Sequence, residues 1–137
     1  VLRKGNNDWD MPTQPQQNRS YAGMRQFRAF NENCYLTAHA GETYDNIARE
    51  IGISAHKLAK YNERPEDAPL NEGEIVWLRK KQRHVPENFG KQYHTVRSNE
   101  SLYDISQQYG IRLKSIMRAN RKIVKRGIKA GDRVVLP

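Results

Sequence analysis

The sequence has few of the features that stabilise a large domain. It contains one cysteine, Cys34, so no disulfide bond can form within the chain. Hydrophobic residues make up 36% of the 137 residues, below the roughly 45–50% that is usual for globular domains. No hydrophobic run approaches the roughly 18 residues of a membrane-spanning helix. We therefore expect small hydrophobic cores, no membrane span and no covalent cross-link.

The motifs of catalytic and metal sites are also missing. The four histidines, His39, His56, His84 and His94, lack metal-ligand spacing with carboxylates or with the single cysteine. There is no glycine-rich loop for phosphate and no recognisable Ser-His-Asp arrangement. We expect a chain without enzyme activity, metal or cofactor.

Acidic residues are outnumbered by basic residues in every part of the chain except residues 35–78. The net charge of +9 divides into +2 for residues 1–34, −4 for 35–78, +4 for 79–92 and +7 for 93–137. A basic surface attracts nucleic acid, an anionic membrane or another anionic polymer through the same Coulomb field. The sign of the charge alone does not indicate which of these partners is bound.

The chain nearly repeats itself. Residues 35–78 align with residues 93–136 at a constant shift of 58 without a gap, and ten positions are identical. The identical pairs are Tyr35/Tyr93, Thr37/Thr95, Glu42/Glu100, Ile47/Ile105, Gly52/Gly110, Ile53/Ile111, Asn62/Asn120, Gly73/Gly131, Val76/Val134 and Leu78/Leu136. Such self-similarity predicts a folding unit that occurs twice. A unit of about 45 residues is near the lower limit for folding alone, so each needs dense local packing or its neighbour.

The first copy predicts strand, helix, helix, strand. Residues 35–39 alternate as in a short strand, and Thr43 is placed to cap a helix that Gly52 ends. The buried face of that helix has helical spacing and consists of Tyr44, Ile47, Ala48 and Ile51. Ser54 caps a second helix of about seven residues. Residues 62–72 are a polar loop with two prolines, and residues 74–78 are the closing strand.

The second copy gives the same order when it is considered independently. Residues 93–97 form a strand, Ser101 caps a helix that Gly110 ends, and a second helix contains Leu113, Ile116 and Met117. Residues 133–137 close the unit. We predict an α+β fold of two tandem βααβ units, in each of which two helices pack on one face of a two-stranded antiparallel sheet.

These elements divide the chain into four parts. Residues 1–34 are expected to be a partly disordered leader or linker, in which residues 21–30 are apolar enough to dock as a strand or a short helix. Residues 35–79 and 93–137 are the repeats. Residues 80–92 form a basic linker that is either a flexible tether or packed between the units.

The two copies resemble the lysin motif (LysM) family. The resemblance rests on Gly41-Glu42-Thr43-Tyr44, Ile47-Ala48, Asn62 and Gly73 with Val76-Trp77-Leu78, and on Asn99-Glu100-Ser101-Leu102, Ile105-Ser106, Asn120 and Gly131 with Val134-Val135-Leu136-Pro137. It covers about two thirds of the chain. Each short match is weak, but the same order occurs twice at one spacing. Asn99 stands where the family has a glycine, and asparagine enters the left-handed region more readily than most residues.

The resemblance implies non-catalytic binding of N-acetylglucosamine-containing glycans, peptidoglycan above all and also chitin-like oligomers. The family holds them between the loop after its first strand and the loop before its second. The implied binding residues are Gly41, Glu42, Thr43, Tyr44, Asn62, Leu70 and Asn71 in the first unit, and Asn99, Glu100, Ser101, Leu102, Asn120, Arg121, Lys125, Arg126 and Ile128 in the second. The first loop carries Glu63, Glu66, Asp67 and Glu72, whereas the second is basic, so we expect the second unit to bind anionic wall polymer better.

The layout is also similar to the C-terminal part of bacterial cell-wall glucosaminidases of Bacteroides-like organisms. That likeness implies a cell-envelope protein, periplasmic or extracellular, that this chain anchors to the wall. The chain starts at Val1 and not at Met, so we expect a processed protein or a fragment whose catalytic domain precedes it.

Two other function classes stay open. Nucleic-acid binding would use the basic residues Arg112, Lys114, Arg118, Arg121, Lys122, Lys125 and Arg126 with Tyr103 and Tyr109 as stacking rings. No RNA-binding signature supports it, so nucleic acid is the less favoured partner. A protein-interaction scaffold in an envelope complex would use residues 21–30 and Trp77.

Overall fold

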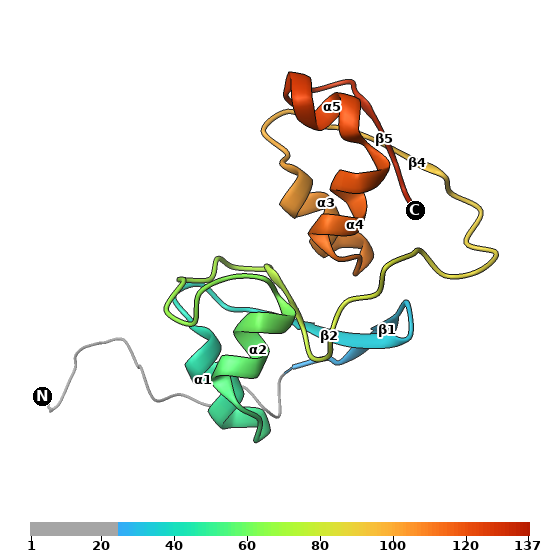
Figure 1. Cartoon of the computed structure of the whole chain (residues 1–137). Coiled ribbons are helices and arrows are strands. Elements are labelled where there is room, and N and C mark those ends of the chain that lie inside the picture. The colour runs from blue at the N-terminus through green and yellow to red at the C-terminus, as the bar shows by residue number, and fades with distance from the viewer. Residues whose placement is uncertain (1–24) are drawn as a thin grey trace, which may run out of the picture.

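The computed structural model describes residues 25–137, which form two units in the order of the two repeats (Figure 1). The expectation for residues 1–24 lies outside the described residues. No helix between residues 25 and 137 has the length and apolar character to cross a membrane.

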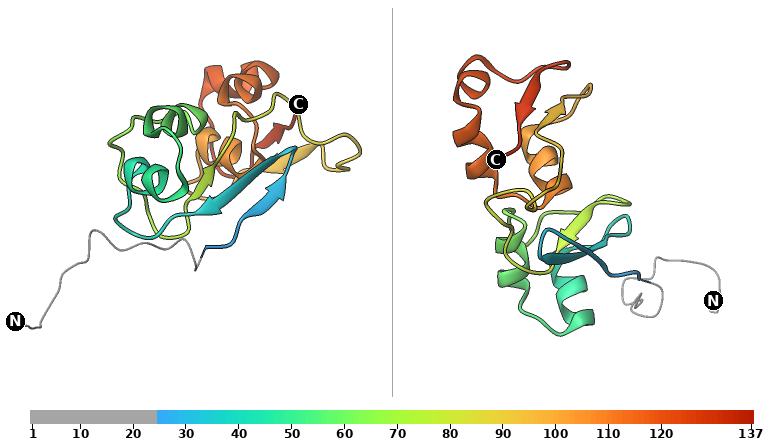
Figure 2. Two further views of the ribbon diagram at one scale, coloured as in Figure 1. Left: turned by 90° about the horizontal axis from the view of Figure 1, so that it is seen from below. Right: turned by 90° about the vertical axis from the view of Figure 1, so that its right-hand side faces the viewer.

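The first unit contains three strands and two helices. They are β1 (Arg28–Phe30), β2 (Asn33–Thr37), α1 (Tyr44–Ile51), α2 (Ala55–Tyr61) and β3 (Ile75–Trp77). The sheet is antiparallel in the order β1-β2-β3, and both helices lie on one side of it (Figure 2). The polar segment with Pro65 and Pro69 between α2 and β3 contains no helix or strand, as predicted.

The second unit contains two strands and three helices. They are β4 (Tyr93–Thr95), α3 (Leu102–Tyr109), α4 (Leu113–Ala119), α5 (Arg121–Arg126) and β5 (Arg133–Val135). Strands β4 and β5 form the predicted two-stranded antiparallel sheet. The predicted α+β fold of two βααβ units is therefore confirmed.

Strand β1 extends the first sheet beyond the two predicted strands. It belongs to the segment expected to be leader, and it joins β2 through Asn31 and Glu32, which both have φ of 54°. Two successive residues with positive φ are the backbone of a type I′ hairpin turn. The sequence signal for such a turn is Asn-Gly or Asp-Gly, and here a glutamate stands in the second position. Because that glycine is missing, the sequence does not predict the hairpin.

Helix α5 also differs from the predicted loop. The first unit breaks this segment with prolines, whereas residues 121–126 contain neither proline nor glycine and Gly127 follows them. Arg and Lys form helices readily, and isoleucine and valine are tolerated. The second loop is therefore partly helical.

The predicted helix ends are confirmed. The hydroxyls of Thr43 and Ser101 accept hydrogen bonds from the amides of Asn46 and Asp104. The side chains of Asn46 and Asp104 accept hydrogen bonds from the amides of Thr43 and Ser101, so both helices begin with a capping box. Gly52 ends α1 and Gly110 ends α3, both in the left-handed conformation.

Each unit has its own hydrophobic core, and the two cores use matching positions. Ile47, Leu58 and Val76 are 0% exposed in the first unit. At the shift of 58, Ile105, Ile116 and Val134 are 0% exposed in the second. The repeat therefore preserves the residues that join the helices to the sheet.

The linker between the units packs on both of them. The amide of Gln82 donates to Gly110 O at 2.9 Å, and the amide of Arg112 donates back to Gln82 O at 2.8 Å. Phe89 meets Phe30 of the first unit and Tyr109 of the second edge-to-face, at 5.5 and 6.1 Å between ring centroids. Of the two alternatives for this linker, the packed one is found.

Trp77 and Lys81 hold the units together. The buried indole of Trp77 donates to Gln107 O at 2.8 Å. Lys81 is 1% exposed, pairs with Glu63 at 2.7 Å and donates to the side chain of Gln107 at 2.8 Å. A binding role for Trp77 on the surface is therefore wrong, because its side chain is buried between the units.

Candidate functional site

The expected sites lie at two loop pairs. We call residues 41–44 with 62–71 the first loop pair, and residues 99–102 with 120–129 the second. Gly41 has φ of 85° and Asn99 has φ of 62°, so the asparagine adopts the left-handed conformation of the glycine that it replaces. The two turns are equivalent in backbone shape.

The repeated glutamates close these turns. A carboxylate oxygen of Glu42 accepts the amide of His39 at 2.7 Å, and one of Glu100 accepts the amide of Arg97 at 3.0 Å. Glu42 is 7% exposed and pairs with Arg25. Their recurrence is thus explained by turn geometry without a ligand.

In the second unit, His94 contacts the turn glutamate, as Arg25 does in the first unit. Its Nε2 lies 2.8 Å from Glu100 Oε1, and its Nδ1 lies 2.8 Å from the hydroxyl of Tyr109. Burial alone would raise the pKa of Glu100, but the hydrogen bonds from the Arg97 amide and from His94 outweigh it and lower that pKa. The sequence does not predict these roles of Arg25 and His94, since no local pattern reveals which cation meets a turn from another segment.

The two repeated asparagines are structural. Asn62 is 0% exposed, donates to Leu58 O and Trp77 O, and accepts the amide of Trp77 at 2.8 Å. Asn120 makes the same three bonds, to Ile116 and to Val135. Each joins the end of a helix to the closing strand. The expectation that their side chains bind glycan is therefore wrong.

The apolar residues of the two loop pairs differ in exposure. Tyr44 is 0% and Leu70 is 2% exposed, so the first loop pair has no apolar side chain of this set for a ligand. Their counterparts Leu102 and Ile128 are half-buried. Tyr44 belongs to the core, as its place on the buried face of the first helix predicts, so its side chain does not offer the glycan contact that the family resemblance implies. Thr43 and Ser101 use their hydroxyls in the caps.

The backbones of the two loop pairs differ as well. In the first, the amide of Gly41 donates to Leu70 O at 3.1 Å and the amide of Leu70 donates to Glu42 O at 2.9 Å. Within residues 25–137, the equivalent amides and carbonyls of Asn99, Glu100 and Ile128 do not form these bonds. The first loop pair is joined by its own backbone, and the second is open. Asn71, the last residue of the first pair, has an exposed side chain.

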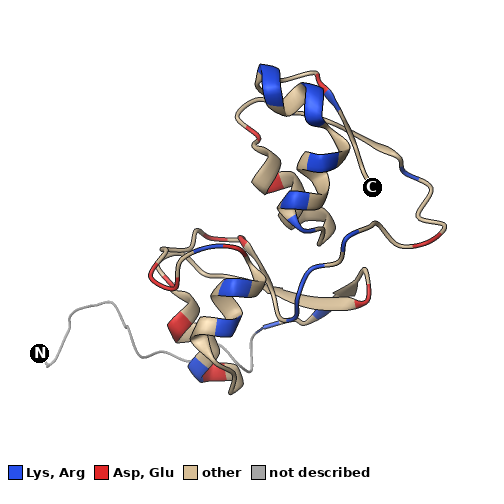
Figure 3. Ribbon diagram, in the orientation of Figure 1, with Lys and Arg blue, Asp and Glu red and all other residues tan. Residues whose placement is uncertain are grey.

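The basic residues of the second unit gather on α4 and α5, whereas acidic residues are frequent in the loops of the first unit (Figure 3). Arg121 and Lys125 line a hollow between the two helices with Lys114, Met117, Arg118 and Val124. Arg126 instead binds Asp132 through two hydrogen bonds of 3.1 and 3.3 Å, and that guanidinium lowers the pKa of Asp132. Arg121 and Lys125 therefore lie against α4 and Arg126 against Asp132.

The two rings named for nucleic-acid stacking are both held by the fold, and only Tyr103 is partly exposed. Tyr109 is 4% exposed, and Tyr103 donates its hydroxyl to Asn62 O at 2.7 Å between the units.

Within residues 25–137, no group of three His, Cys, Asp or Glu side chains is arranged to hold a metal ion.

Comparisons with known proteins agree with the repeat. The family model described as "LysM domain" matches residues 37–79 and 94–137. Among solved structures, the chain is similar to the spore cortex-lytic enzyme SleL of Bacillus cereus, with 22% identity and a TM-score of 0.31. It is also similar to SleL of Bacillus megaterium QM B1551, with 25% identity and a TM-score of 0.30. Each alignment covers 75% of this chain and 22% of the enzyme. The search of the curated proteins found no match.

Proposed function

Because the chain belongs to the LysM domain family, we propose that its second loop pair binds a glycan strand that contains N-acetylglucosamine. LysM domains are binding domains and generally recognise such glycans, peptidoglycan among them. We propose peptidoglycan as the ligand and chitin-like oligomers as soluble substitutes. In this proposal the chain has no catalytic role.

The observation that carries the proposal is the difference between the two loop pairs. The amides of Asn99 and Ile128 and the carbonyls of Glu100 and Ile128 lack the bonds that join the first loop pair. Those groups are a matched set of donors and acceptors for an N-acetyl group, and each hydrogen bond contributes only about 0.5–1.5 kcal/mol. One site should therefore bind short oligomers at about millimolar to micromolar Kd.

Apolar contact and charge support the same unit. The half-buried Leu102 and Ile128 offer a wall for the acetyl methyl group. The second unit is basic, and the peptide stems of peptidoglycan carry carboxylates, so the long-range field favours approach to this unit. We propose that the chain anchors a larger cell-wall protein or hydrolase in a bacterial envelope, periplasmic or extracellular.

A direct test is an NMR titration of the whole chain with N-acetylglucosamine trimers, together with sedimentation on insoluble peptidoglycan. We expect the amide resonances of Asn99 and Ile128 to shift with the ligand. Gly41 and Leu70 occupy the same positions in the first unit and should not move, so they are an internal control. We also expect the chain to sediment with peptidoglycan and to be released by the trimers.

Two results would overturn the proposal. One is movement at Gly41 and Leu70 in place of Asn99 and Ile128, which would assign binding to the first unit. The other is the absence of both shifts and sedimentation. Retention on DNA, weakened by salt, without retention on peptidoglycan would instead favour nucleic acid as the partner.

A further inference from the structure

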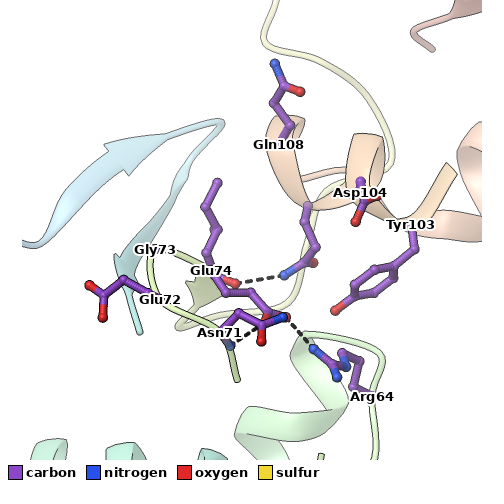
Figure 4. Close-up of a pocket in the computed structure, with 10 residues that line it drawn as sticks. Arg64, Asn71, Glu72, Gly73, Glu74, Tyr103, Asp104 and Gln108 are labelled. Carbon is purple, nitrogen blue, oxygen red and sulfur yellow. Dashed lines mark hydrogen bonds and ion pairs between the residues drawn. The ribbon is translucent and has the colours of Figure 1, made fainter. Parts of the chain in front are cut away.

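A hollow of about 740 Å³ lies between the two units and belongs to neither alone. Its size falls in the range of small-molecule sites, about 300–1,000 Å³. One wall is the loop before β3, with Asn71, Glu72 and Gly73, together with Arg64. The other wall is α3, with Tyr103, Asp104, Gln107 and Gln108, as Figure 4 shows. The family comparison concerns each unit separately and does not assign a site here.

The base of this interunit hollow is fixed by polar contacts that are already complete. Arg64 pairs with Glu74. Tyr103 donates its hydroxyl to Asn62 O at 2.7 Å, and Gln107 donates to Ile75 O at 3.0 Å. The bonds of Tyr103 and Gln107 cross between the units and hold the two walls together. A ligand would enter a preformed space without ordering either wall.

The rim offers neutral hydrogen-bonding groups. The amide side chains of Asn71 and Gln108 are exposed, and neither has a hydrogen-bond partner within the part of the chain that the structure describes. They stand on opposite walls. Beside them are the half-buried ring of Tyr103 and the side chain of Ile75, which supply apolar surface. Amides beside an aromatic ring suit a sugar, which has hydroxyls at its edge and C–H groups on its faces.

The charge of the hollow selects against anions. The one cation among its lining residues, Arg64, is paired with Glu74, while Glu72 and Asp104 add two exposed carboxylates. Phosphates, carboxylates and nucleic acid would be repelled. A neutral sugar ring is not.

The position of the hollow connects the two loop pairs. Asn71 is the last residue of the first loop pair, and Asp104 lies two residues after the turn 99–102 of the second. A glycan strand that leaves the second loop pair toward the first unit therefore meets this hollow.

We propose that the interunit hollow is an additional subsite for one neutral sugar residue of the glycan strand held by the second loop pair. This inference rests on the proposed function. It makes the pair of units one extended site for a single strand, with Asn71 and Gln108 as the specificity-determining side chains.

The test compares oligomer length in calorimetric titrations of the whole chain. In the wild-type protein we expect N-acetylglucosamine hexamers to bind more tightly than trimers, because only the longer oligomer reaches the hollow. The double variant Asn71→Ala/Gln108→Ala should bind hexamers about tenfold more weakly, which is the expected effect of losing two hydrogen bonds. Its affinity for trimers should not change. Gln92→Ala, another exposed glutamine outside the hollow, is the matched control and should bind both oligomers as the wild type does.

Each other result has a definite meaning. If hexamers bind the double variant as tightly as the wild type, or if they bind the wild type no more tightly than trimers do, the hollow is not a subsite, and the proposed function stands. If neither oligomer binds and the amides of Asn99 and Ile128 do not shift, both proposals are overturned. Because both substituted side chains are exposed, the variant should unfold at the wild-type temperature, which calorimetry of the free protein checks.

Discussion

At the scale of the residue, repetition identified the fold more reliably than the ligand. Glu42 and Glu100 recur because each carboxylate accepts an amide three residues earlier in a tight turn. Asn62 and Asn120 recur because each fastens a helix end to a closing strand through three hydrogen bonds. A recurrent polar residue in a small unit therefore has a structural explanation when its side chain is buried and fully bonded.

The turn carboxylate of the second unit predicts a pH dependence. The folded-state pKa of Glu100 is lowered, so its contribution to stability is complete above the ordinary pKa of glutamate, about 4.3. It is lost as the pH falls through the lower folded-state pKa. We expect the free energy of unfolding in urea to decrease with acidification in this range, and to decrease less steeply in Glu100→Gln. Glu87→Gln changes an exposed glutamate of the linker and should follow the wild type. Parallel curves for all three proteins would contradict this role of Glu100.

At the scale of the element, the two units differ by an added strand in the first and an added helix in the second. The hairpin of β1 and β2 places Asn31 at its tip, where the buried side chain donates to His84 O at 2.8 Å and to Tyr109 O at 3.2 Å. The added strand thus reaches the second unit. Helix α5 stands where the first unit has a proline-containing loop, and it makes the two loop pairs different in shape.

The hairpin turn predicts a stabilising substitution. Glu32 is exposed and has φ of 54°, a conformation that costs about 1–2 kcal/mol for a residue with a Cβ atom. Glu32→Gly removes that strain, and the entropic cost of ordering a glycine is smaller than the strain that is removed. We therefore expect the free energy of unfolding to rise by about 0.5–1 kcal/mol.

The neighbouring residue is the control for this turn. Asn31 has the same φ, but Asn31→Gly also removes the two hydrogen bonds of its side chain to the second unit. We expect that variant to be less stable than the wild type in urea or thermal unfolding. A gain in stability from both glycines would mean that the bonds of Asn31 contribute little, and a loss from both would refute the strain at Glu32.

At the scale of the whole molecule, the two units form a fixed pair. Contacts between the units are made by the linker, the tip of the hairpin, Trp77 and Lys81. Burial lowers the pKa of Lys81, and its pairing with Glu63 offsets this only in part. The buried ammonium of Lys81 contacts Glu63 of the first unit and Ser106 and Gln107 of the second, so it favours the arrangement of the units in which all three contacts form. A binding surface can then extend across both units.

Substitutions at two equivalent glycines distinguish the stability of one unit from the stability of the contact between the two units. Gly52 and Gly110 end α1 and α3 with positive φ, but a Cβ atom on Gly52 would meet nothing within 4 Å, whereas one on Gly110 would lie 2.9 Å from the ring of Trp77. We expect Gly52→Ala to cost about 1–2 kcal/mol from backbone strain. Gly110→Ala should cost about 1–3 kcal/mol more from the clash.

Chemical denaturation followed by tryptophan fluorescence measures both variants, in a Trp9→Phe background that leaves Trp77 as the single tryptophan of the chain. Since Trp77 is buried between the units, its emission should move toward longer wavelength in native Gly110→Ala and stay unchanged in native Gly52→Ala. Equal losses of stability and equal emission in the two variants would show that the units are not held together at this contact.

The sequence by itself determined the two units, their helix caps, their terminal glycines and the faces of their helices, because those features depend on residues within one turn or one strand. It also located both loop pairs, since the turn residues are local. Only the tertiary structure decided that the first loop pair is joined by its own backbone, that Trp77 is buried between the units, and that a hollow opens between Asn71 and Gln108. These results depend on contacts between segments distant in the sequence. The spacing of 58 relates equivalent residues, and it contains no information about how the two copies pack against each other.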